Sequence, residues 1–201
     1  MTWGPPNKEL KQTKPHVPER EWDKMLRGEL YLASDSELVA ARVRARRLWA
    51  EFNRSDPADD SLRARVLSEL LGGIGSRSSI EPPFYCDYGS NVVLGDDVFV
   101  NFGAVFLDPG RITLGHQVQR GPMVQLLTAD HPRKAALRVA GPELARPITI
   151  GSRAWLGGGV IVCPGVTIGE EAVVGAGSVV VRDVPAGVVA AGNPCRVIKR
   201  T

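Results

Sequence analysis

Residues 150–185 read IGSRAW, LGGGVI, VCPGVT, IGEEAV, VGAGSV and VVRDVP, and this stretch decides the fold. Each six-residue unit begins with an aliphatic residue and has a small or β-branched residue four places later. A helix repeats near 3.6 residues and a flat strand near 2, so neither produces a repeat of six. Three such units make one turn of a coil whose turns stack about 4.8 Å apart. The stretch therefore predicts a parallel β-coil with a continuous aliphatic column inside it.

The same repeat extends toward the N-terminus in a less regular form. Its expected inward positions are Leu94, Val100, Phe106, Leu114 and Leu126. Arg120 stands where an aliphatic residue is expected, so either the coil is deformed there or the guanidinium reaches solvent or a partner. Glycines are expected at the corners, where the backbone needs a positive φ or close packing. An all-β sandwich is the structural alternative, but it does not explain consecutive six-residue units in register.

Three segments are predicted along the chain: a flexible tail over 1–18, a helical cap over 19–75 and the coil over 76–201. The tail is rich in proline and polar residues and has too little hydrophobic content to order itself. The cap is expected to be helical from about Glu19 to Leu71, with one helix capped by Ser34 or Asp35 and a second starting near Asp60. The buried faces are expected to hold Leu38, Val39, Leu48, Trp49 and Phe52, and then Leu62, Val66, Leu67, Leu70 and Leu71, before Gly72-Gly73 ends the second helix.

Composition and charge exclude several classes of protein. The chain has 201 residues, of which 43% are hydrophobic and 23% charged, as in an ordinary globular protein. No apolar run approaches the roughly 18 residues of a transmembrane helix, and the start lacks the pattern of a signal peptide, so we expect a cytoplasmic protein without membrane contact. The net charge of +3 is too small to indicate nucleic-acid binding. The basic run over 42–47 is therefore expected to be a solvated helix face.

The three cysteines, Cys86, Cys163 and Cys195, are far apart and odd in number. That pattern favours buried thiols over a disulfide framework or a metal site.

One interruption of the coil has the composition of a functional loop. Residues 128–147, TADHPRKAALRVAGPELARP, are too polar and too rich in proline to form a coil turn. A loop of this length inside a compact repeat is usually functional or disordered. It contains one histidine, His131.

Taken together, these motifs resemble the maltose and galactoside O-acetyltransferases, a nodulation-type sugar acetyltransferase group within the hexapeptide-repeat acyltransferases. The resemblance covers about residues 20–200. It rests on MLRGELYLASDSEL (25–38), RARRLWAEFN (44–53), YGSNVVLGDDVFVNFGAVFLD (88–108), the TADHP loop, PITIGSRAWLGGGVIVCPGVTIG (147–169) and VVAAGNPCRVIKR (188–200).

This resemblance implies a mainly β fold, a left-handed parallel β-helix with a small N-terminal helical cap. It also implies a homotrimer with active sites between subunits. The reaction it implies is transfer of acetyl from acetyl-CoA to a sugar hydroxyl, with no metal required.

His131 matches the family's catalytic histidine, and a neutral imidazole is suited to take the proton of the attacking hydroxyl. The alternative is a solvated loop histidine, but the HP sequence inside the long interruption favours catalysis. Glu143 lies at the far end of the loop. It either accepts a hydrogen bond from the second ring nitrogen and fixes the tautomer, or is an exposed surface carboxylate.

Acceptor contacts carry over from the family to Asp87, Asn101 and Asp108. Short polar groups of this kind suit hydrogen bonds to sugar hydroxyls. Asn and Asp are also common turn residues, so corner geometry is the alternative explanation. Phe99 supplies the aromatic ring expected near Asn101, without the phenolic hydroxyl found in some relatives.

Coenzyme A contacts carry over to Trp155, Gly158, Ala176 and Gly177 along the pantetheine arm, and to Arg182, Arg196 and Lys199 at the phosphate end. Small residues let the arm approach backbone amides, which are also suited to hold a developing oxyanion. Guanidinium groups suit phosphate geometry. Corner geometry of the coil is again the alternative for the small residues.

Several other functions remain alternatives. Another acceptor, such as an amino sugar or an antibiotic, is possible within the same enzyme class. A non-catalytic β-helix scaffold does not explain His131, Trp155 and the basic C-terminal residues together. A zinc enzyme of the carbonic anhydrase kind needs three converging histidines, and His16 lies in the tail.

Overall fold

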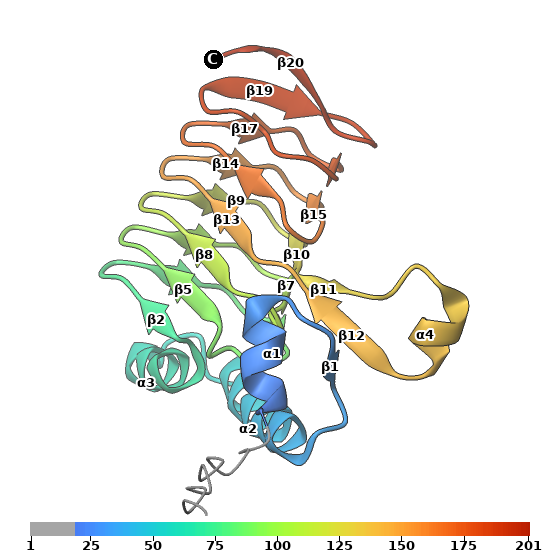
Figure 1. Ribbon diagram of the computed structural model, residues 1–201. Helices are drawn as coiled ribbons and strands as arrows, with labels where there is room; N and C mark the ends of the chain where they lie inside the picture. Colours follow the sequence, from blue (N-terminus) through green and yellow to red (C-terminus); the bar gives the residue numbers. More distant parts are fainter. Residues whose placement is uncertain (1–18) are drawn as a thin grey trace, which may run out of the picture.

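The computed structural model describes residues 19–201 and shows a helical cap at one end of a three-sided parallel β-helix (Figure 1). The cap contains helices α1 (Glu21–Arg27), α2 (Ser36–Asn53) and α3 (Asp60–Leu70). Asp35 caps α2, because its side chain accepts hydrogen bonds from the second and third residues of the turn. Asp59 caps α3 through a single hydrogen bond from the amide of Leu62. The tail predicted over 1–18 lies outside the described residues.

The cap differs from the sequence prediction in two places. The segment from 19 to 71 is not continuously helical, because Gly28 ends α1 and a short strand follows, β1 (Tyr31–Leu32). Val39 was expected on the buried face of α2 but is 42% exposed. Adjacent helical residues point about 100° apart, so the burial of Leu38 turns Val39 outward.

The coil has three faces of parallel strands stacked turn upon turn. The first face holds β2 (Gly73–Ile74), β5 (Val92–Leu94), β8 (Ile112–Leu114), β13 (Ile148–Ile150) and β16 (Thr167–Ile168). The second holds β3 (Ser79–Ile80), β6 (Phe99–Val100), β9 (Gln119–Arg120), β14 (Trp155–Leu156), β17 (Val173–Val174), β19 (Val188–Ala191) and β20 (Arg196–Arg200). The third holds β4 (Phe84–Cys86), β7 (Ala104–Leu107), β10 (Gln125–Leu127), β15 (Ile161–Val162) and β18 (Val179–Val180).

The first coil strand, β2, pairs with β5. The coil therefore begins within the stretch assigned to the cap.

The predicted aliphatic column fills the interior. Its members Ile150, Leu156, Val162, Ile168, Val174 and Val180 are all buried, as are Leu94, Val100, Phe106, Leu114 and Leu126. The prediction for Arg120 is wrong on both counts. The strand holding it pairs regularly with both neighbours, and the side chain is 2% exposed. Its guanidinium lies inside the coil, 4.4 Å from the ring centre of Phe106, and no nitrogen of it finds a hydrogen-bond partner among residues 19–201.

The turns of the coil meet at three corners, which differ in composition. The ladder corner, between the first and second faces, comprises 75–78, 95–98, 115–118, 151–154 and 169–172. The glycine corner, between the second and third faces, comprises 81–83, 101–103, 121–124, 157–160 and 175–178. The loop corner, between the third and first faces, comprises 87–91, 108–111, 128–147, 163–166 and 181–183.

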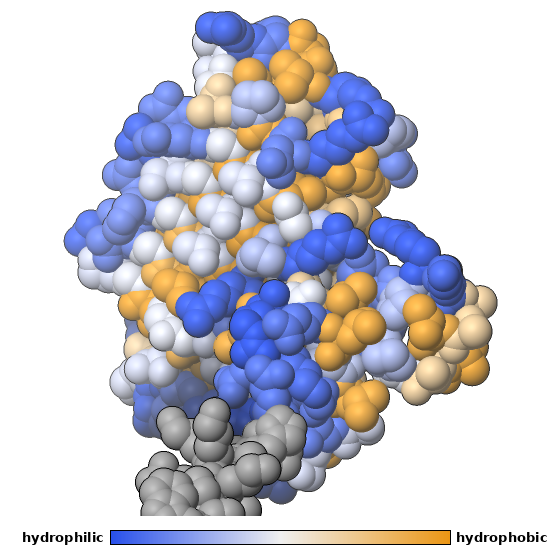
Figure 2. All heavy atoms as spheres, in the orientation of Figure 1, coloured by the Kyte–Doolittle hydropathy of each residue, from blue (hydrophilic) through white to orange (hydrophobic). Residues whose placement is uncertain are grey.

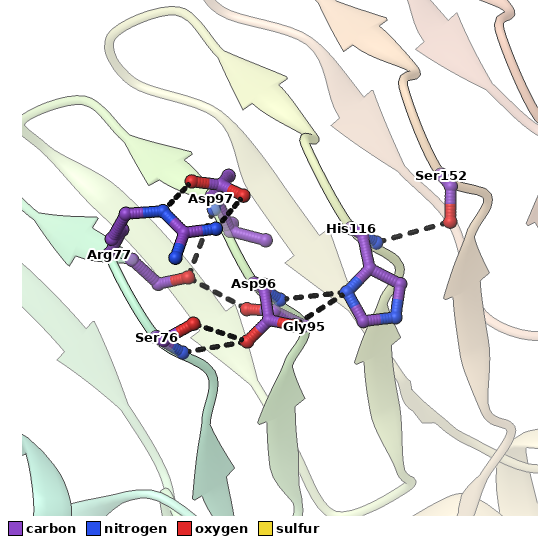
Figure 3. A network of polar contacts seen from close by, with 9 residues as sticks. Ser76, Arg77, Gly95, Asp96, Asp97, His116 and Ser152 are labelled. Carbon is purple, nitrogen blue, oxygen red and sulfur yellow. Dashed lines mark hydrogen bonds and ion pairs between the residues drawn. The ribbon is translucent and has the colours of Figure 1, made fainter.

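The ladder corner is held by polar contacts between successive turns (Figure 3). Asp96 accepts from both the amide and the hydroxyl of Ser76, and its own amide donates to Nδ1 of His116 at 3.0 Å. Arg77 forms a two-pronged ion pair with Asp97. The expectation of glycine holds for close packing: glycine opens each turn of this corner, and a Cβ on Gly75, Gly95, Gly115, Gly151 or Gly169 would come within 3.0 Å of the adjacent turn. It is wrong for positive φ, because the positions with positive φ are Arg77, Asp97, Gln117, Arg153 and Glu171. Hydrogen bonds to the next turn stabilise the left-handed conformation instead.

The cap is tied to the coil by packing and by one reciprocal pair of hydrogen bonds. Phe52, Val66 and Leu70 belong to the same buried cluster as the coil interior. The side-chain amide of Asn53 donates to the carbonyl of Phe84 at 2.9 Å and accepts from its amide at 2.8 Å. The first turn of the coil is therefore covered by helix rather than left as an open edge.

Within residues 19–201, none of the helices combines the length and hydrophobicity that crossing a bilayer requires.

Candidate active site

The loop corner carries the long interruption, which has secondary structure of its own. Residues 128–147 contain β11 (Ala129–Asp130), α4 (Ala135–Val139) and β12 (Pro142–Ala145), and the loop projects from the side of the coil (Figure 1). Strand β12 lies between β11 and β1 in an antiparallel sheet. The cap therefore contributes one strand to the sheet that supports the loop.

The antiparallel sheet brings together Tyr31, Glu143 and the strand that ends before His131. In the β11–β12 pair, Ala129 lies opposite Ala145 and Asp130 opposite Leu144. The pairing ends at Asp130, and His131 is the next residue, so His131 and Glu143 both lie next to the last pair of these two strands. On the other side of β12, Glu143 pairs with Tyr31. Side chains directly opposite one another project from the same face of a sheet, so Tyr31 and Glu143 share a face. These two residues and the adjoining His131 are together called the row.

His131 is exposed, and its backbone is fixed by its neighbour. The amide of His131 donates to Oδ1 of Asp130 at 2.8 Å. The other oxygen of Asp130 accepts from Arg146, and Arg133 lies 3.7 Å away. These contacts hold the backbone at the histidine while the imidazole remains accessible.

Glu143 is half-buried and is not a free surface carboxylate. Its Oε2 accepts a hydrogen bond from the hydroxyl of Tyr31 at 2.9 Å. Burial raises the pKa of the Tyr31 hydroxyl, and the charge of Glu143 adds to the shift. The hydroxyl therefore remains protonated and donates. Sequence reasoning missed Tyr31, because the two residues are 112 positions apart.

Asp87 and Asp108 lie together at the loop corner. Oδ1 of Asp108 accepts from the amides of Asp87 at 3.0 Å and Tyr88 at 2.8 Å. Asp108 is fully buried, and its Oδ2 has no partner among the described residues. Burial raises the pKa of Asp108 to about 7, although the two amides oppose the shift. Asp108 thus fixes the turn that presents the more accessible Asp87.

The charges around Asp87 link the loop to the cap. Burial raises the pKa of Asp87, and Glu143 adds to that shift, while Arg42 and Arg46 of α2 oppose it. Arg42 also donates to the hydroxyl of Tyr88 at 2.6 Å. The loop corner therefore presents two half-buried carboxylates near the arginines of α2.

The other predicted contacts lie at the glycine corner and on the second face. Asn101 follows β6, and its Oδ1 accepts from the amide of Phe102 at 2.8 Å. Trp155 projects from β14 and is 54% exposed. Gly158 and Gly177 occupy this corner one turn apart, joined by a hydrogen bond from the amide of Gly177 to the carbonyl of Gly158 at 2.9 Å. Ala176 lies next to them and is exposed.

Coil geometry explains one of these two glycines. Gly177 has a φ of +71°, which favours glycine whatever the space around it. Gly158 has no such φ, and a Cβ built there would meet Pro122 at 3.4 Å, an ordinary contact. The coil itself therefore does not require glycine at 158.

The three predicted cationic residues lie at two different surface depressions. Arg182 and Arg196 line one hollow of about 130 Å³ with Asp183 and Cys195. Lys199 lines a different depression, near Gly187. The structure thus brings the two arginines together and leaves the lysine apart from them.

Nine of the twelve predicted site residues form two sets on one protomer, and the three cationic residues lie at the C-terminal end of the coil. His131, Glu143, Asp87 and Asp108 lie at the loop corner, whereas Asn101, Gly158, Ala176 and Gly177 lie at the glycine corner, near Trp155 on the second face. The third face separates the two corners.

The cysteines are free thiols, and Cys86 and Cys195 are buried as predicted. Cys163 is only half-buried, contrary to expectation, because it lies at the loop corner directly after β15 and packs against the edge of the core. Among residues 19–201 no cluster of three or more histidine, cysteine or acidic side chains is arranged to hold a metal ion.

Comparison with known proteins agrees with this architecture. Residues 24–75 match the maltose acetyltransferase hexapeptide capping motif, and residues 147–182 match the bacterial transferase hexapeptide family of six repeats. Nodulation protein L of Rhizobium leguminosarum bv. viciae is 48% identical over 87% of this chain and 92% of its own length.

Two solved structures are also similar. A maltose O-acetyltransferase from Clostridium difficile is 43% identical with a TM-score of 0.90, over 92% of this chain and 98% of that one. A galactoside acetyltransferase in complex with coenzyme A is 38% identical with a TM-score of 0.87, over 90% and 91% of the two chains. The predicted β-helix of hexapeptide repeats with a helical cap is thereby confirmed, and the chain belongs to the hexapeptide-repeat acetyltransferases, in the group that carries the maltose acetyltransferase cap.

Proposed function

We propose that this protein is an acetyl-CoA-dependent O-acetyltransferase whose acceptor is a sugar hydroxyl and whose general base is His131. As a member of this family it is an acyltransferase that uses acetyl-CoA. The finer proposal is supported by the hydrogen bond from Tyr31 to Glu143, by the half-buried carboxylate of Asp87 near Glu143, and by the place of His131 at the end of β11 in the same sheet.

In the proposed reaction His131 takes the proton of the acceptor hydroxyl as that oxygen bonds to the acetyl carbonyl carbon. The carbon–sulfur bond of the thioester then breaks, and the imidazolium returns the proton to the departing thiolate. General-base catalysis of this kind typically contributes 10²- to 10⁴-fold. Glu143 supports the step by holding the proton of the second ring nitrogen, so that the nitrogen facing the acceptor remains free.

The acceptor side of the site is supported by Asp87 and Asp108. A half-buried carboxylate at the loop corner is suited to accept from one hydroxyl while a neighbouring hydroxyl is oriented for attack. Asp108 supports this geometry by fixing the backbone of Asp87. A sugar, with several adjacent hydroxyls, is the acceptor class that such an arrangement fits.

Coenzyme A binding is proposed at the glycine corner and the C-terminal end of the coil. The backbone amides of Gly158 and Ala176 donate to no acceptor within residues 19–201, so they are available to the amide groups of the pantetheine arm or to a developing oxyanion. Arg182 and Arg196, at one hollow, supply the cations for phosphate. Lys199, on β20, lines a separate depression and is proposed as a further cation for the phosphate end.

The separation of the two sets of residues supports a homotrimer with active sites between subunits. His131 lies at the loop corner and Trp155 on the second face, so a site that uses both needs two copies of the chain. The projecting loop is rich in exposed hydrophobic side chains around α4 (Figure 2), where Leu137 is 48% and Val139 85% exposed. Such a surface is suited to pack on a neighbouring protomer.

The first test is acetyl-CoA-dependent thiol release with maltose, glucose, galactosides, amino sugars, serine and chloramphenicol as acceptors. We expect release with a sugar, and a kcat lowered by roughly 10²- to 10⁴-fold in His131→Ala with binding of coenzyme A unchanged. Turnover like that of the wild type in this variant would remove His131 from the mechanism. Stimulation by chloramphenicol alone would reassign the acceptor class.

A second test addresses the shared site. His131→Ala and Trp155→Ala are each expected to be inactive as pure proteins. The two variants are mixed, unfolded and refolded together. Each site is formed by two chains taken at random, so about a quarter of the sites should combine an intact His131 with an intact Trp155. No recovery of activity in the mixture would place both halves on one protomer.

We also propose that the protein works in the cytoplasm, with a helical cap followed by a catalytic coil that begins at β2. The free thiols of its three cysteines are compatible with a reducing compartment.

A further inference from the structure

We propose that Tyr31, a residue of the cap, is a positioning residue of the active site: it holds the carboxylate of Glu143 in place beside His131. This inference rests on the proposed role of His131. It assigns the cap strand β1 a function in the chemistry, beyond covering the end of the coil.

The backbone sets the geometry on both sides of Glu143. Strand β12 is the middle strand of its sheet, with β11 on one side and β1 on the other. Tyr31 is the paired partner of Glu143 on one side of β12, and on the other side β11 ends at Asp130, directly before His131. The three side chains therefore keep their order as long as the sheet is intact.

The hydroxyl of Tyr31 is aimed at one oxygen of Glu143. The ring is 1% exposed, packed in a small core with Met25, Leu38, Tyr88 and Ala145. Its only freedom is rotation of the hydroxyl hydrogen, and the hydroxyl oxygen lies 2.9 Å from Oε2. A rigid donor of this kind fixes the carboxylate at little cost in conformational entropy.

Holding one oxygen leaves the other for the histidine. With Oε2 occupied by Tyr31, Oε1 of Glu143 is free to accept the Nδ1–H of His131. That contact would keep the proton on Nδ1 and leave Nε2 as the base. Without the Tyr31 hydroxyl, no other side chain among residues 19–201 donates a hydrogen bond to the Glu143 carboxylate, so its orientation is no longer fixed.

The test is Tyr31→Phe, which keeps the ring and removes only the hydroxyl. Loss of a hydrogen bond worth about 1 kcal/mol corresponds to roughly a 3- to 10-fold lower kcat. We expect the KM for acetyl-CoA to stay unchanged. The acid limb of kcat/KM against pH should move to higher pH, because an unshared carboxylate stabilises the imidazolium more strongly.

Tyr85→Phe is the matched control. Tyr85 is 40% exposed on β4, where its ring contacts Trp49, so this variant loses a hydroxyl outside the row. It should keep the wild-type kcat and pH profile. The other charged groups that bear on the row are unchanged in both variants: Asp87, Arg42, Arg46, Asp130 and Arg146.

A double-mutant cycle with Glu143→Ala shows whether Tyr31 acts through Glu143. If it does, Tyr31→Phe lowers kcat in the wild type but has no further effect in Glu143→Ala. Equal effects in both backgrounds would overturn the inference, as would a Tyr31→Phe protein that matches Tyr85→Phe in rate and pH profile. Wild-type turnover in His131→Ala would instead overturn the proposed function, so the two failures are distinguishable.

Discussion

Replacing the buried Arg120 with methionine is expected to stabilise the protein. Its guanidinium is 2% exposed and lies in the column between Val100 and Leu156 of the adjacent strands. None of its nitrogens is hydrogen-bonded within the described part of the chain, and its one favourable contact there is the ring of Phe106. A charge in this environment opposes folding, because burial removes its hydration without replacing it.

The size of the effect follows from the titration of the side chain. Burial lowers the pKa of Arg120 from 12.5 to about 9. That difference corresponds to about 5 kcal/mol against the charged form. The cation–π contact with Phe106 offsets about 2 kcal/mol of this cost in the wild type. Methionine is smaller than arginine and leaves a cavity that lowers the stability of the variant by about 1 kcal/mol. The free energy of unfolding should therefore rise by about 2 kcal/mol, and Tm by about 4 to 8 °C for a chain of this length.

Urea unfolding at fixed protomer concentration measures this change, since assembly adds to apparent stability. Leu156→Met is the control, because it introduces the same side chain into the same column without removing a charge. The pH dependence is a second check. Above about pH 9 the folded state loses the proton of Arg120 before the unfolded state does, so the wild type gains stability relative to Arg120→Met. The advantage of the variant should be full at pH 7 and smaller at pH 10.

A loss of stability in Arg120→Met larger than that of Leu156→Met would refute this reasoning. That result would mean that the folded protein stabilises the guanidinium of Arg120 through interactions other than its contact with Phe106.

Three further predictions concern single side chains. Gly158→Ala should leave the urea midpoint unchanged and raise the KM for acetyl-CoA, whereas Gly177→Ala should lower stability by about 1 to 2 kcal/mol, because alanine is strained at positive φ. Asn53→Ala should lower the free energy of unfolding by about 1 to 3 kcal/mol, seen as a lower urea midpoint, since it leaves the backbone of Phe84 unpaired. For Asp108→Asn, urea midpoints at pH 5 and pH 8 should show the variant improving relative to the wild type at the higher pH, because the wild-type carboxyl, with a pKa raised to about 7, must ionise while buried. A constant difference between the two pH values would contradict that account.

The coil was predictable because its rule is local. Each inward residue of the 150–185 stretch is specified by its place in a six-residue unit, and the first residues of all six units are buried. The predictions fail at positions whose conformation is stabilised by contacts with a neighbouring turn. Arg77 and Asp97 adopt positive φ at the ladder corner because they are bonded to the next turn, which a residue-by-residue preference for glycine does not include.

The candidate site was predictable only in part, because its parts meet through long-range pairing. The loop and its histidine stand out in the sequence, and so does Glu143 at the far end of that loop. Strand β1 does not, since two residues carry no periodicity and their partners lie more than a hundred positions away. The sequence also does not show that the site residues divide between two corners, because the same six-residue repeat forms all three faces.

The antiparallel pairing of β20 with β19 also determines what the far end of the coil presents to other molecules. If the last parallel strand were uncovered, its unpaired backbone amides and carbonyls could hydrogen-bond to the end of a second coil. Strand β20 runs against that direction, is exposed along its whole length, and places Arg196, Lys199 and Arg200 on the outermost edge. Positive charges on an antiparallel edge strand discourage the end-to-end stacking of two coils. A protein from which β20 has been removed should therefore be prone to form filaments.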